Sequence, residues 1–447
     1  MAEAADSQAP GSLRRRAISG TIATLAGFGA SQVLRLGSNL VLSRLLFPKA
    51  FGLMAVVALF MQGLAMFSDI GITPAIVQHK DGAQESFLNT AWTMQVMRGF
   101  ALWICLALLA YPVSLFYQEP ELRYLLPAVG LNAVITGFRS TAVATLNRKL
   151  MLGRLTIVDL VAQAVSVAAM VSYALLHKSV WALVVGSVVG SFVSVVLSHV
   201  VLPGIRHRLH WERGSSKELF KFGRWVTLST AFSFLASQGD RAILSTFVSL
   251  TMIGVYSVAA NLQQTALGIF NRLGDSVLFP MYATWGREDP AKLKAKLRQV
   301  RIKTLWWFML PPCGMAILGA PVVRLLYDVR YHEAAWMLPL MGVSLLLHVL
   351  VITIDPILLA TGDSFRHMLV TIAKGLMVFL AMVIGGHVDG VRGVLLGSIA
   401  GRALQYPLVA LAIRSKGAWT PWIDLIGVTA SAVLIVGARA LLGHWVS

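Results

Sequence analysis

Charged residues inside apolar segments are the part of this sequence that could do chemistry. Seven cations fall in such segments: Arg35, Arg98, Arg139, Arg241, Arg272, Lys374 and Arg402. A charge at the centre of a bilayer costs at least about 2.5–3.5 kcal/mol on insertion scales, so each cation needs water, an ion-pair partner or an anionic ligand. A guanidinium group donates two parallel hydrogen bonds to a phosphate, so the arginines predict a site for an anionic substrate.

We interpret five of these cations as substrate-binding candidates: Arg35, Arg98, Arg139, Arg241 and Arg272. Near the ends of their helices, Arg272, Lys374 and Arg402 could instead extend to lipid headgroups. The alternative for the deeper arginines is a salt bridge between helices, for example among Arg241, Asp159 and Asp275.

Five aspartates share the apolar segments with the cations: Asp69, Asp159, Asp240, Asp275 and Asp355. They could be ion-pair partners, or they could carry H⁺ or Na⁺ if burial raises their pKa. Ion coupling is therefore a hypothesis for these aspartates. No cofactor is expected beyond a coupling ion.

The full sequence lacks the motifs of common enzyme classes. It contains no GxxxxGK[ST] phosphate-binding loop, no HExxH and no CxxC. Cys105 and Cys313 both lie in apolar segments and predict neither a disulfide nor a metal site. We therefore predict a protein that is not an enzyme and has neither catalytic nor metal-binding residues.

Composition indicates the elements that must position these charges. Of 447 residues, 57% are hydrophobic and only 13% are charged, whereas a soluble domain has about 25% charged residues. The apolar residues form blocks of about 20, the length that crosses a bilayer as a helix. A polytopic α-helical membrane protein is predicted, because a membrane β-barrel would show short alternating strands.

We expect thirteen spanning segments, at 18–43, 50–72, 89–112, 122–145, 155–177, 179–202, 222–248, 252–280, 304–327, 335–360, 366–387, 391–413 and 423–443. With the N-terminus inside, cytoplasmic connections carry 23 Lys and Arg residues and the opposite loops carry eight. This bias favours a cytoplasmic N-terminus. The net charge of +18 is then explained by anionic lipid headgroups and topology, without nucleic acid. Residues 284–303 are either an amphipathic helix at headgroup level or a solvated basic loop.

An internal repeat relates two parts of the chain. Residues 31–62 and 233–264 share eight of 32 positions at a fixed offset of 202, including Gly52 with Gly254. The offset spans six expected helices, so both copies have the same orientation in the membrane. We expect two six-helix lobes around a central cavity, related by a pseudo-two-fold axis along the membrane normal, plus one extra C-terminal helix.

The expected domains follow from these boundaries. They are a cytoplasmic N-terminal tail at 1–17, an N-lobe at 18–203, a basic cytoplasmic linker at 204–221, a C-lobe at 222–413 and the C-terminal helix region at 414–447.

Two stretches carry a family resemblance: LSRLLFPKAFGLMAVVALFMQGLAMFSDIGITPAIVQ and GDRAILSTFVSLTMIGVYSVAANL. They resemble the first helical pair and the helix 7–8 region of Wzx-type polysaccharide transporters, within the multidrug/oligosaccharidyl-lipid/polysaccharide exporter superfamily. The resemblance extends with less force over nearly the whole chain. It implies a twelve-helix core, and this chain departs from the pattern by ending after one apparent extra helix.

The resemblance implies a flippase that moves undecaprenyl-diphosphate-linked oligosaccharide across the bacterial inner membrane, for exopolysaccharide, capsule or O-antigen (lipopolysaccharide). Its implied partners are that lipid-linked oligosaccharide, membrane lipid and the polysaccharide polymerase machinery. Three alternatives stay open: a cation-coupled multidrug exporter, a lipid II flippase, and a membrane glycosyltransferase or polymerase. The intramembrane arginines disfavour the first, the short chain disfavours the second, and the small outside loops disfavour the third.

Overall fold

The chain is helical wherever its structure is described. The computed structural model describes residues 10–441 except 70, 80, 149–151, 218, 220–233, 235–237, 275–277, 279–280, 283–289, 356, 359–362, 415–418 and 420. Every regular element in these ranges is a helix, and eight of the described helices are long and apolar enough to cross a membrane. A helix satisfies its backbone hydrogen bonds internally, which hydrocarbon requires. The prediction of an all-α polytopic membrane protein is confirmed.

The chain divides into two compact units. Unit 1 contains Met1–Leu46 and Val56–Ala231, and unit 2 contains Phe47–Ala55 and Phe232–Ser447. The helix α3 (Pro48–Phe67) therefore begins in unit 2 and continues in unit 1.

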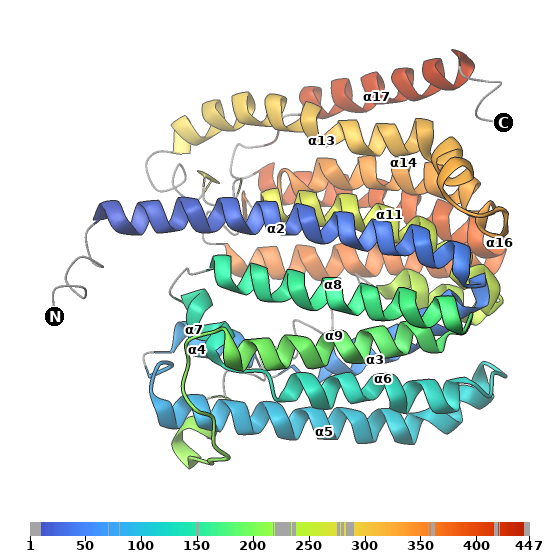
Figure 1. Ribbon diagram of the computed structural model, residues 1–447. Helices are drawn as coiled ribbons and strands as arrows, with labels where there is room; N and C mark the ends of the chain where they lie inside the picture. Colours follow the sequence, from blue (N-terminus) through green and yellow to red (C-terminus); the bar gives the residue numbers. More distant parts are fainter. Residues whose placement is uncertain are drawn as a thin grey trace. The chain divides into compact units, whose positions relative to one another are not determined.

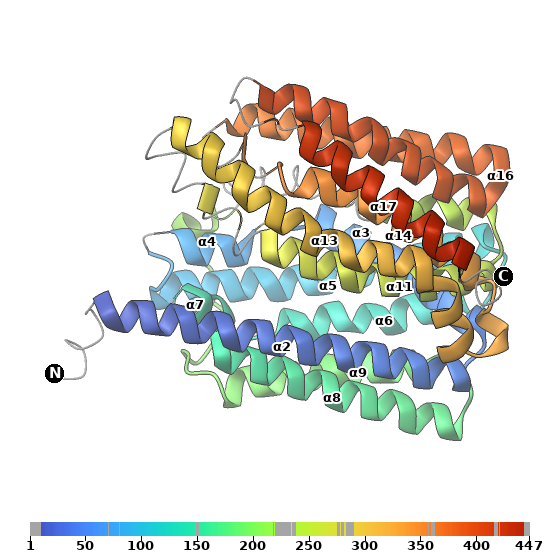
Figure 2. The same cartoon turned by 90° about the horizontal axis from the view of Figure 1, so that it is seen from above.

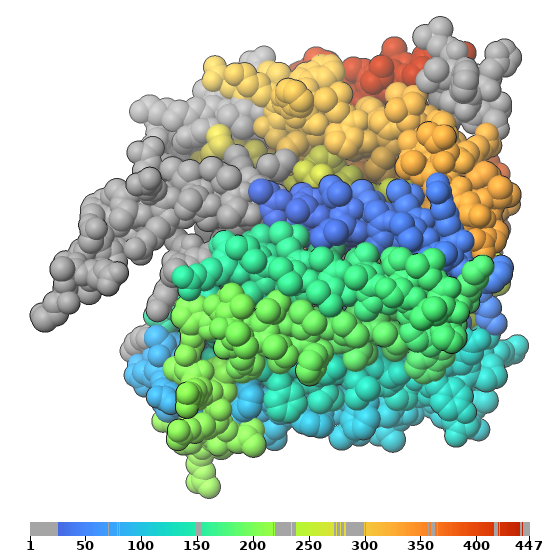
Figure 3. All heavy atoms as spheres, viewed as in Figure 1, coloured from blue at the N-terminus to red at the C-terminus, as the bar shows by residue number. Residues whose placement is uncertain are grey.

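Unit 1 is built from long helices that pack lengthwise and from two short ones, α4 (Ile72–Gln78) and α7 (Ala142–Arg148) (Figures 1 and 2). Besides α3, the long helices are α2 (Pro10–Leu45), α5 (Glu85–Phe116), α6 (Leu122–Gly137), α8 (Leu152–Leu176) and α9 (Trp181–Val200). The helix α5 packs on α6, α8 packs on α2 and α9, and α4 packs on α7. The helices α8 and α9 lie on the face seen in Figure 3. They carry exposed apolar side chains such as Ile157 and Phe192. Lipid would cover such a face.

Two predicted spans of unit 1 extend past the end of a long helix, and a short helix follows each break. The span 50–72 ends as α3 at Phe67, and the short α4 follows. The span 122–145 divides into α6 and α7, with a break at 138–141. Side chains compete with the helix at both breaks: an Asp69 carboxylate oxygen accepts from the Gly71 N–H at 3.0 Å, and the backbone N–H of Ser140 donates to Ser198 at 3.1 Å.

Unit 2 contains a described helix at 238–247 and six further elements. These are α11 (Leu250–Leu273), α13 (Pro290–Leu326), η3 (Val329–Tyr331), α14 (Ala334–Ile352), α16 (Ser364–Arg414) and α17 (Pro421–Leu441). The helix α14 packs on α11, α13 and α16, and α17 packs on α13. A buried apolar core that includes Phe270, Phe308 and Leu345 joins α11, α13 and α14.

The element α16 is two helices joined by a sharp turn. Asp389 (φ −146°) and Gly390 (φ 49°) have non-helical backbone angles, and the positive φ at position 390 suits glycine. The turn separates the two arms where the sequence predicts separate spans at 366–387 and 391–413. The last helix, α17, agrees with the predicted thirteenth segment at 423–443.

Two further expectations, for the N-terminal tail and for the basic segment before the span at 304–327, differ from the structure. Helix α2 begins at Pro10, inside the predicted tail 1–17, while residues 1–9 lie outside the described residues. Residues 290–303 form neither a separate interfacial helix nor a loop, because α13 runs without a break from Pro290 to Leu326. The predicted segment 222–248 falls mostly outside the described residues.

Within unit 2, the start of α3 crosses α11 at a pair of glycines. A Cβ placed on Gly52 would lie 1.8 Å from the Leu250 carbonyl oxygen, and one on Gly254 would lie 1.9 Å from the Pro48 carbonyl oxygen. These four residues are repeat equivalents, since Gly52 corresponds to Gly254 and Pro48 to Leu250 at the offset of 202. The contact is therefore reciprocal, as in a two-fold symmetric interface. It supports the internal repeat found in the sequence.

Candidate functional site

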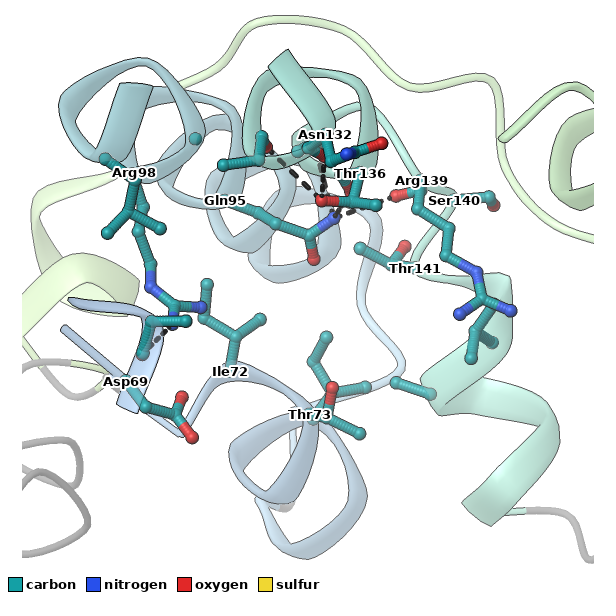
Figure 4. A pocket seen from close by; sticks show the side chains of 18 of the residues that line it. Asp69, Ile72, Thr73, Gln95, Arg98, Asn132, Thr136, Arg139, Ser140 and Thr141 are labelled. Carbon is teal, nitrogen blue, oxygen red and sulfur yellow. Dashed lines mark hydrogen bonds between the residues drawn. The ribbon is translucent and has the colours of Figure 1, made fainter. Parts of the chain in front are cut away.

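A cavity of about 450 Å³, lined by both polar and apolar groups, lies inside unit 1 beside the two helix breaks. Its walls come from α3, α4, α5, α6, the turn at 138–141 and α7. Figure 4 shows Arg98 and Asp69 on one side, Arg139 on the opposite side and Gln95 between them. The cavity thus brings together three of the ten residues that the sequence predicts as binding or ion-coupling residues.

The guanidinium group of Arg98 is held by the end of α3. Its Nε donates to the Ser68 hydroxyl at 3.0 Å, and its Nη2 donates to the Ala65 carbonyl oxygen. Asp69 adds a favourable electrostatic interaction with this arginine. Arg98 therefore links α5 to the segment that carries Asp69.

Arg139 forms an ion pair with Asp159 of α8. The Nη2–Oδ1 distance is 2.6 Å, with 28% of the Arg139 side chain and 59% of the Asp159 side chain exposed. Among the described residues, the Arg139 Nε has no hydrogen-bond acceptor. The sequence analysis suggested a salt bridge between Asp159 and Arg241. In the structure Asp159 does form a salt bridge, but with Arg139.

Gln95 joins α5 to the break after α6. Its amide nitrogen donates to the carbonyl oxygens of Thr136, Gly137 and Arg139 at 3.0–3.1 Å. These carbonyls lie at the end of α6, where the helical hydrogen bonds run out, although the Thr136 carbonyl also accepts from the Arg139 backbone N–H at 3.0 Å. Gln95 thereby fixes the shape of the cavity wall.

The linker after α9 fixes the same wall from outside the cavity. His207 Nε2 accepts from the Thr141 backbone N–H at 3.2 Å and contacts the Ser140 hydroxyl at 2.9 Å. Its ring stacks on Trp92, with 5.3 Å between ring centroids. Because Nε2 accepts from an N–H, the bound ring is neutral and the serine hydroxyl donates to it.

Further along, the linker follows the first turns of α5. The backbone N–H groups of Arg208, His210 and Glu212 donate to the side-chain oxygens of Asn89, Thr93 and Thr90 at 3.0–3.2 Å. In an extended segment, residues two positions apart face the same side. The N–H groups of these three alternate residues therefore all face α5.

We expect low pH to weaken unit 1 through His207. Burial, with a smaller effect from His199, lowers the pKa of His207 to about 4, below its ordinary 6.5. The unfolded chain therefore takes up this proton first, and folded stability falls as the pH decreases from about 6.5 to 4. Above 6.5 both states are neutral at this residue, so it adds no pH dependence.

Melting temperatures of the purified protein between pH 4 and 8 would measure this effect. The His207→Gln variant should lose part of the acid-side slope that the wild type shows. Equal slopes for His207→Gln and the wild type would contradict the assignment.

Unit 2 holds a second polar cluster, around Asp240. The Tyr256 hydroxyl donates to the Asp240 Oδ2 at 2.6 Å, and Arg241 donates to the Gln238 side-chain oxygen at 3.1 Å. Arg402 interacts electrostatically with both Asp240 and Tyr256. Arg402 therefore interacts with an interior carboxylate, whereas the sequence placed it near a lipid headgroup.

The remaining predicted residues lie apart from the unit 1 cavity or cannot be placed. Arg35 lies part-buried on α2 and does not line the cavity. Asp355 pairs with Lys374 at 2.6 Å, so Lys374 also has an interior partner where a headgroup was expected. Arg272 belongs to α11 but its side chain lies outside the described structure, as does the whole of Asp275. Within the described ranges, no three His, Cys, Asp or Glu side chains gather as metal ligands.

Sequence reasoning missed the uncharged members of the site. Gln95, Asn132 and Thr141 line the cavity beside the charged residues. Each is a polar residue within or next to an apolar segment, which is the only signal that could have identified it.

Comparisons with known proteins relate the chain to polysaccharide biosynthesis. A family model described as "Polysaccharide biosynthesis protein" matches residues 41–336. The lipopolysaccharide biosynthesis protein WzxC of Escherichia coli is 24% identical over 86% of this chain and 78% of its own length. The succinoglycan biosynthesis transport protein ExoT of Rhizobium meliloti is 23% identical over 68% of this chain, which matches only 61% of ExoT.

Solved transporters share the fold. The lipid II flippase MurJ in an inward closed conformation has a TM-score of 0.73 at 12% identity, covering 96% of this chain and 100% of MurJ. An inward-facing multidrug resistance transporter of the MATE family has a TM-score of 0.66 at 14% identity, covering 86% and 95%. At these identities the likeness establishes the architecture alone.

Proposed function

The chain belongs to the polysaccharide biosynthesis protein family, and from this premise we propose that it is a flippase for undecaprenyl-diphosphate-linked oligosaccharide. The proposed product is an exported polysaccharide: exopolysaccharide, capsule or O-antigen. WzxC and ExoT, named for lipopolysaccharide biosynthesis and succinoglycan transport, support this class of cargo. The fold shared with a lipid II flippase supports the lipid-linked form.

One observation carries the proposal: a cavity lined in part by charged and polar side chains, inside a unit of apolar spanning helices. A sugar-diphosphate headgroup cannot enter hydrocarbon unaided, because its polar groups would lose their hydrogen bonds. The cavity offers such groups partners, from the guanidinium of Arg98 to the amide of Gln95. Outside it, Arg35, Arg241 and Arg272 are proposed to meet the diphosphate while the polyprenyl tail stays in lipid.

Movement by alternating access, coupled to H⁺ or Na⁺, completes the proposal. Asp240 is the aspartate best suited to respond to an ion, because its hydrogen bonds come from neutral donors, the Tyr256 hydroxyl and the Arg241 backbone N–H, while Arg402 acts on it electrostatically. Asp69, which lines the cavity, is the second. Asp159 and Asp355 are already in ion pairs with Arg139 and Lys374, so coupling through them would require those pairs to open.

The proposed location is the bacterial inner membrane, with the N-terminus in the cytoplasm. This orientation puts the linker and its His207 contacts on the cytoplasmic side, and the Asp389–Gly390 turn outside. Alkaline phosphatase fused after Gly390 should be active, and the same enzyme fused within the linker at Gly214 should be inactive. The reverse pattern would invert the topology.

We expect Arg98→Ala to reduce polysaccharide export about tenfold or more without loss of protein from the membrane. The substitution removes two charge-assisted hydrogen bonds that hold the cavity wall, and one such bond is worth about 1.5–3 kcal/mol. Surface polysaccharide in a complemented deletion strain measures the effect. Arg98→Lys should restore export only in part, since an ammonium lacks the planar fork.

The matched control is Arg123→Ala, whose guanidinium lies over the Tyr111 ring away from the cavity. It should export normally. Deletion of the gene should also cause lipid-linked intermediate to accumulate on the inner leaflet. A deletion strain with normal surface polysaccharide and no accumulated intermediate would rule out the proposed function.

A further inference from the structure

We propose that the linker after α9 carries a docking surface for anionic phospholipid headgroups. The surface is formed by residues 205–217, which we call the strap and which the structure describes throughout. In Figure 1 the strap is the yellow-green segment that passes the ends of α9 and α5, and in Figure 3 its atoms lie on the surface of unit 1. The inference requires a protein in a membrane and does not depend on the proposed cargo.

The inner side of the strap is fixed to unit 1 at several points. Ile205 packs against an apolar cluster of α4 and α5 side chains, and His207 bonds to the turn at 138–141. Three backbone N–H groups then donate to α5 side chains. At the far end Ser215 and Ser216 are buried, and Leu219 just beyond them belongs to the same apolar cluster. The backbone is therefore held in place, and its outward side chains are presented at fixed positions.

The outer side of the strap combines positive charge with apolar area. Leu209 is 73% exposed and Trp211 is 46% exposed. The strap has one acidic residue, Glu212, whose carboxylate accepts from the Ser215 hydroxyl at 2.8 Å. Its exposed cations are Arg206, Arg208, Arg213 and Lys217. The surface is thus strongly basic around an exposed leucine and tryptophan.

The strap lies near the depth of lipid headgroups. From Gly99 to Phe116 the helix α5 has no charged residue, and at about 1.5 Å per residue this stretch spans about 27 Å, close to the thickness of the hydrocarbon. Thr93, which accepts from the strap backbone, lies about 9 Å before this stretch. Long cationic side chains and a tryptophan on a segment at that level can extend into the headgroup layer.

These properties match an anionic lipid surface better than water. Tryptophan gathers at the boundary between membrane and water, and a leucine beside it adds apolar area that can enter the headgroup layer. An arginine donates two parallel hydrogen bonds to a phosphate group. Each cation near a membrane surface strengthens attraction to anionic lipid about fivefold. Phosphatidylglycerol offers a phosphate with net negative charge, whereas phosphatidylcholine is neutral overall.

The diphosphate of a cargo would offer the same phosphate chemistry, but the strap is separate from the cavity. His207 contacts Ser140 and Thr141 from the outer side of the cavity wall. Among the described residues that line the cavity, none belongs to the strap. We therefore assign the surface to membrane lipid.

A nitroxide at residue 209 tests the position of the strap. Leu209→Cys is made in a chain that carries Cys105→Ser and Cys313→Ala, and the purified full chain is placed in nanodiscs of mixed phosphatidylcholine and phosphatidylglycerol. The label should collide strongly with a nickel-chelating lipid headgroup and more weakly with a soluble nickel complex. Phe192→Cys on α9, at a side chain that is 60% exposed, is the reference for hydrocarbon and should collide weakly with both. Collision at residue 209 with the soluble complex alone would show a strap in water, open to an acidic protein, and would overturn the proposal.

The chemistry of the surface is tested by Arg206→Gln and Arg208→Gln together. Both side chains are exposed, and Arg208 contacts α5 through its backbone, so the variant should fold. The matched control is Arg123→Gln with Lys178→Gln. It removes two exposed cations from the starts of α6 and α9, at the other end of unit 1.

The melting temperature is followed as lipid is added to the purified protein in detergent. Phosphatidylglycerol should raise it in the wild type and the control at similar concentrations, and the strap variant should need about fivefold more, or higher still, for the same rise. High salt should reduce the effect, and phosphatidylcholine should have little effect. An unchanged phosphatidylglycerol requirement in the strap variant would overturn the proposal. An equal rise with sodium pyrophosphate alone would do so too, because it would assign the surface to a diphosphate.

Discussion

Replacement of Asp424 by alanine is expected to remove most of the folded protein from the membrane. Asp424 Oδ1 accepts from Arg301 Nη2 at 2.5 Å, and its Oδ2 accepts from the Tyr406 hydroxyl at 2.5 Å. The Arg301 side chain is only 1% exposed and the Asp424 side chain 4%. Removing one partner of a buried pair leaves an uncompensated charge and costs about 3–5 kcal/mol. That loss is comparable with the whole stability of many domains.

Yield and melting temperature in detergent measure the result. The control is Asp328→Ala, which breaks a partly exposed pair with Arg330 (2.7 Å) and should lower the yield and melting temperature much less, because water screens such pairs. The double variant Arg301→Met with Asp424→Leu should recover much of the loss, because it leaves no charge buried. Asp424→Ala protein with the wild-type yield and melting temperature would show that the pair does not hold α17 to α13.

Substitution of Gly254 by alanine is expected to separate α3 from α11 and abolish export. The new Cβ would fall 1.9 Å from the Pro48 carbonyl oxygen, far inside van der Waals contact, and a backbone atom cannot rotate away. The helices would have to move apart by more than 1 Å along a close-packed contact. The repeat predicts the same outcome for Gly52→Ala, whose Cβ would meet the Leu250 carbonyl oxygen.

Gly314→Ala on α13 is the matched control, because a Cβ at Gly314 would meet nothing within 4 Å. In a helix, alanine is more favourable than glycine by roughly 0.5–1 kcal/mol, so this variant should be as stable as the wild type or slightly more so. Melting temperature and export are compared for all three variants. Full export from both Gly52→Ala and Gly254→Ala would mean that the crossing is not close-packed in the working protein.

The helices were largely predictable, and the helix breaks were not. Hydropathy identified both arms of α16 and the final α17 because each needs about 20 apolar residues to cross the bilayer. It treated 50–72 and 122–145 as single spans, since hydropathy does not register a side chain that competes for backbone hydrogen bonds. Ser140 pairs with Ser198, 58 residues away, and no local pattern reveals such a partner.

The candidate site was predicted in part, through its charges. Arg98, Arg139 and Asp69 were identified because a charge within an apolar segment is conspicuous. Arg301 was assigned to a basic cytoplasmic loop, yet it is among the most buried side chains of unit 2. The sequence around an arginine does not show whether its side chain lies in a loop or is buried. For Arg301 the answer depends on Asp424, which is 123 residues away in the chain.

Amino-acid order and hydropathy were sufficient for the class, the approximate helices, the repeat and the presence of interior charge. These properties depend on short segments and on the thickness of a bilayer, which acts on every helix alike. The cavity and the sense of its hydrogen bonds came from the folded chain. Gln95 faces its carbonyl partners only because α5 packs beside the end of α6, 41 to 44 residues further along. Contacts at that separation depend on how the helices pack, which the amino-acid sequence does not show locally.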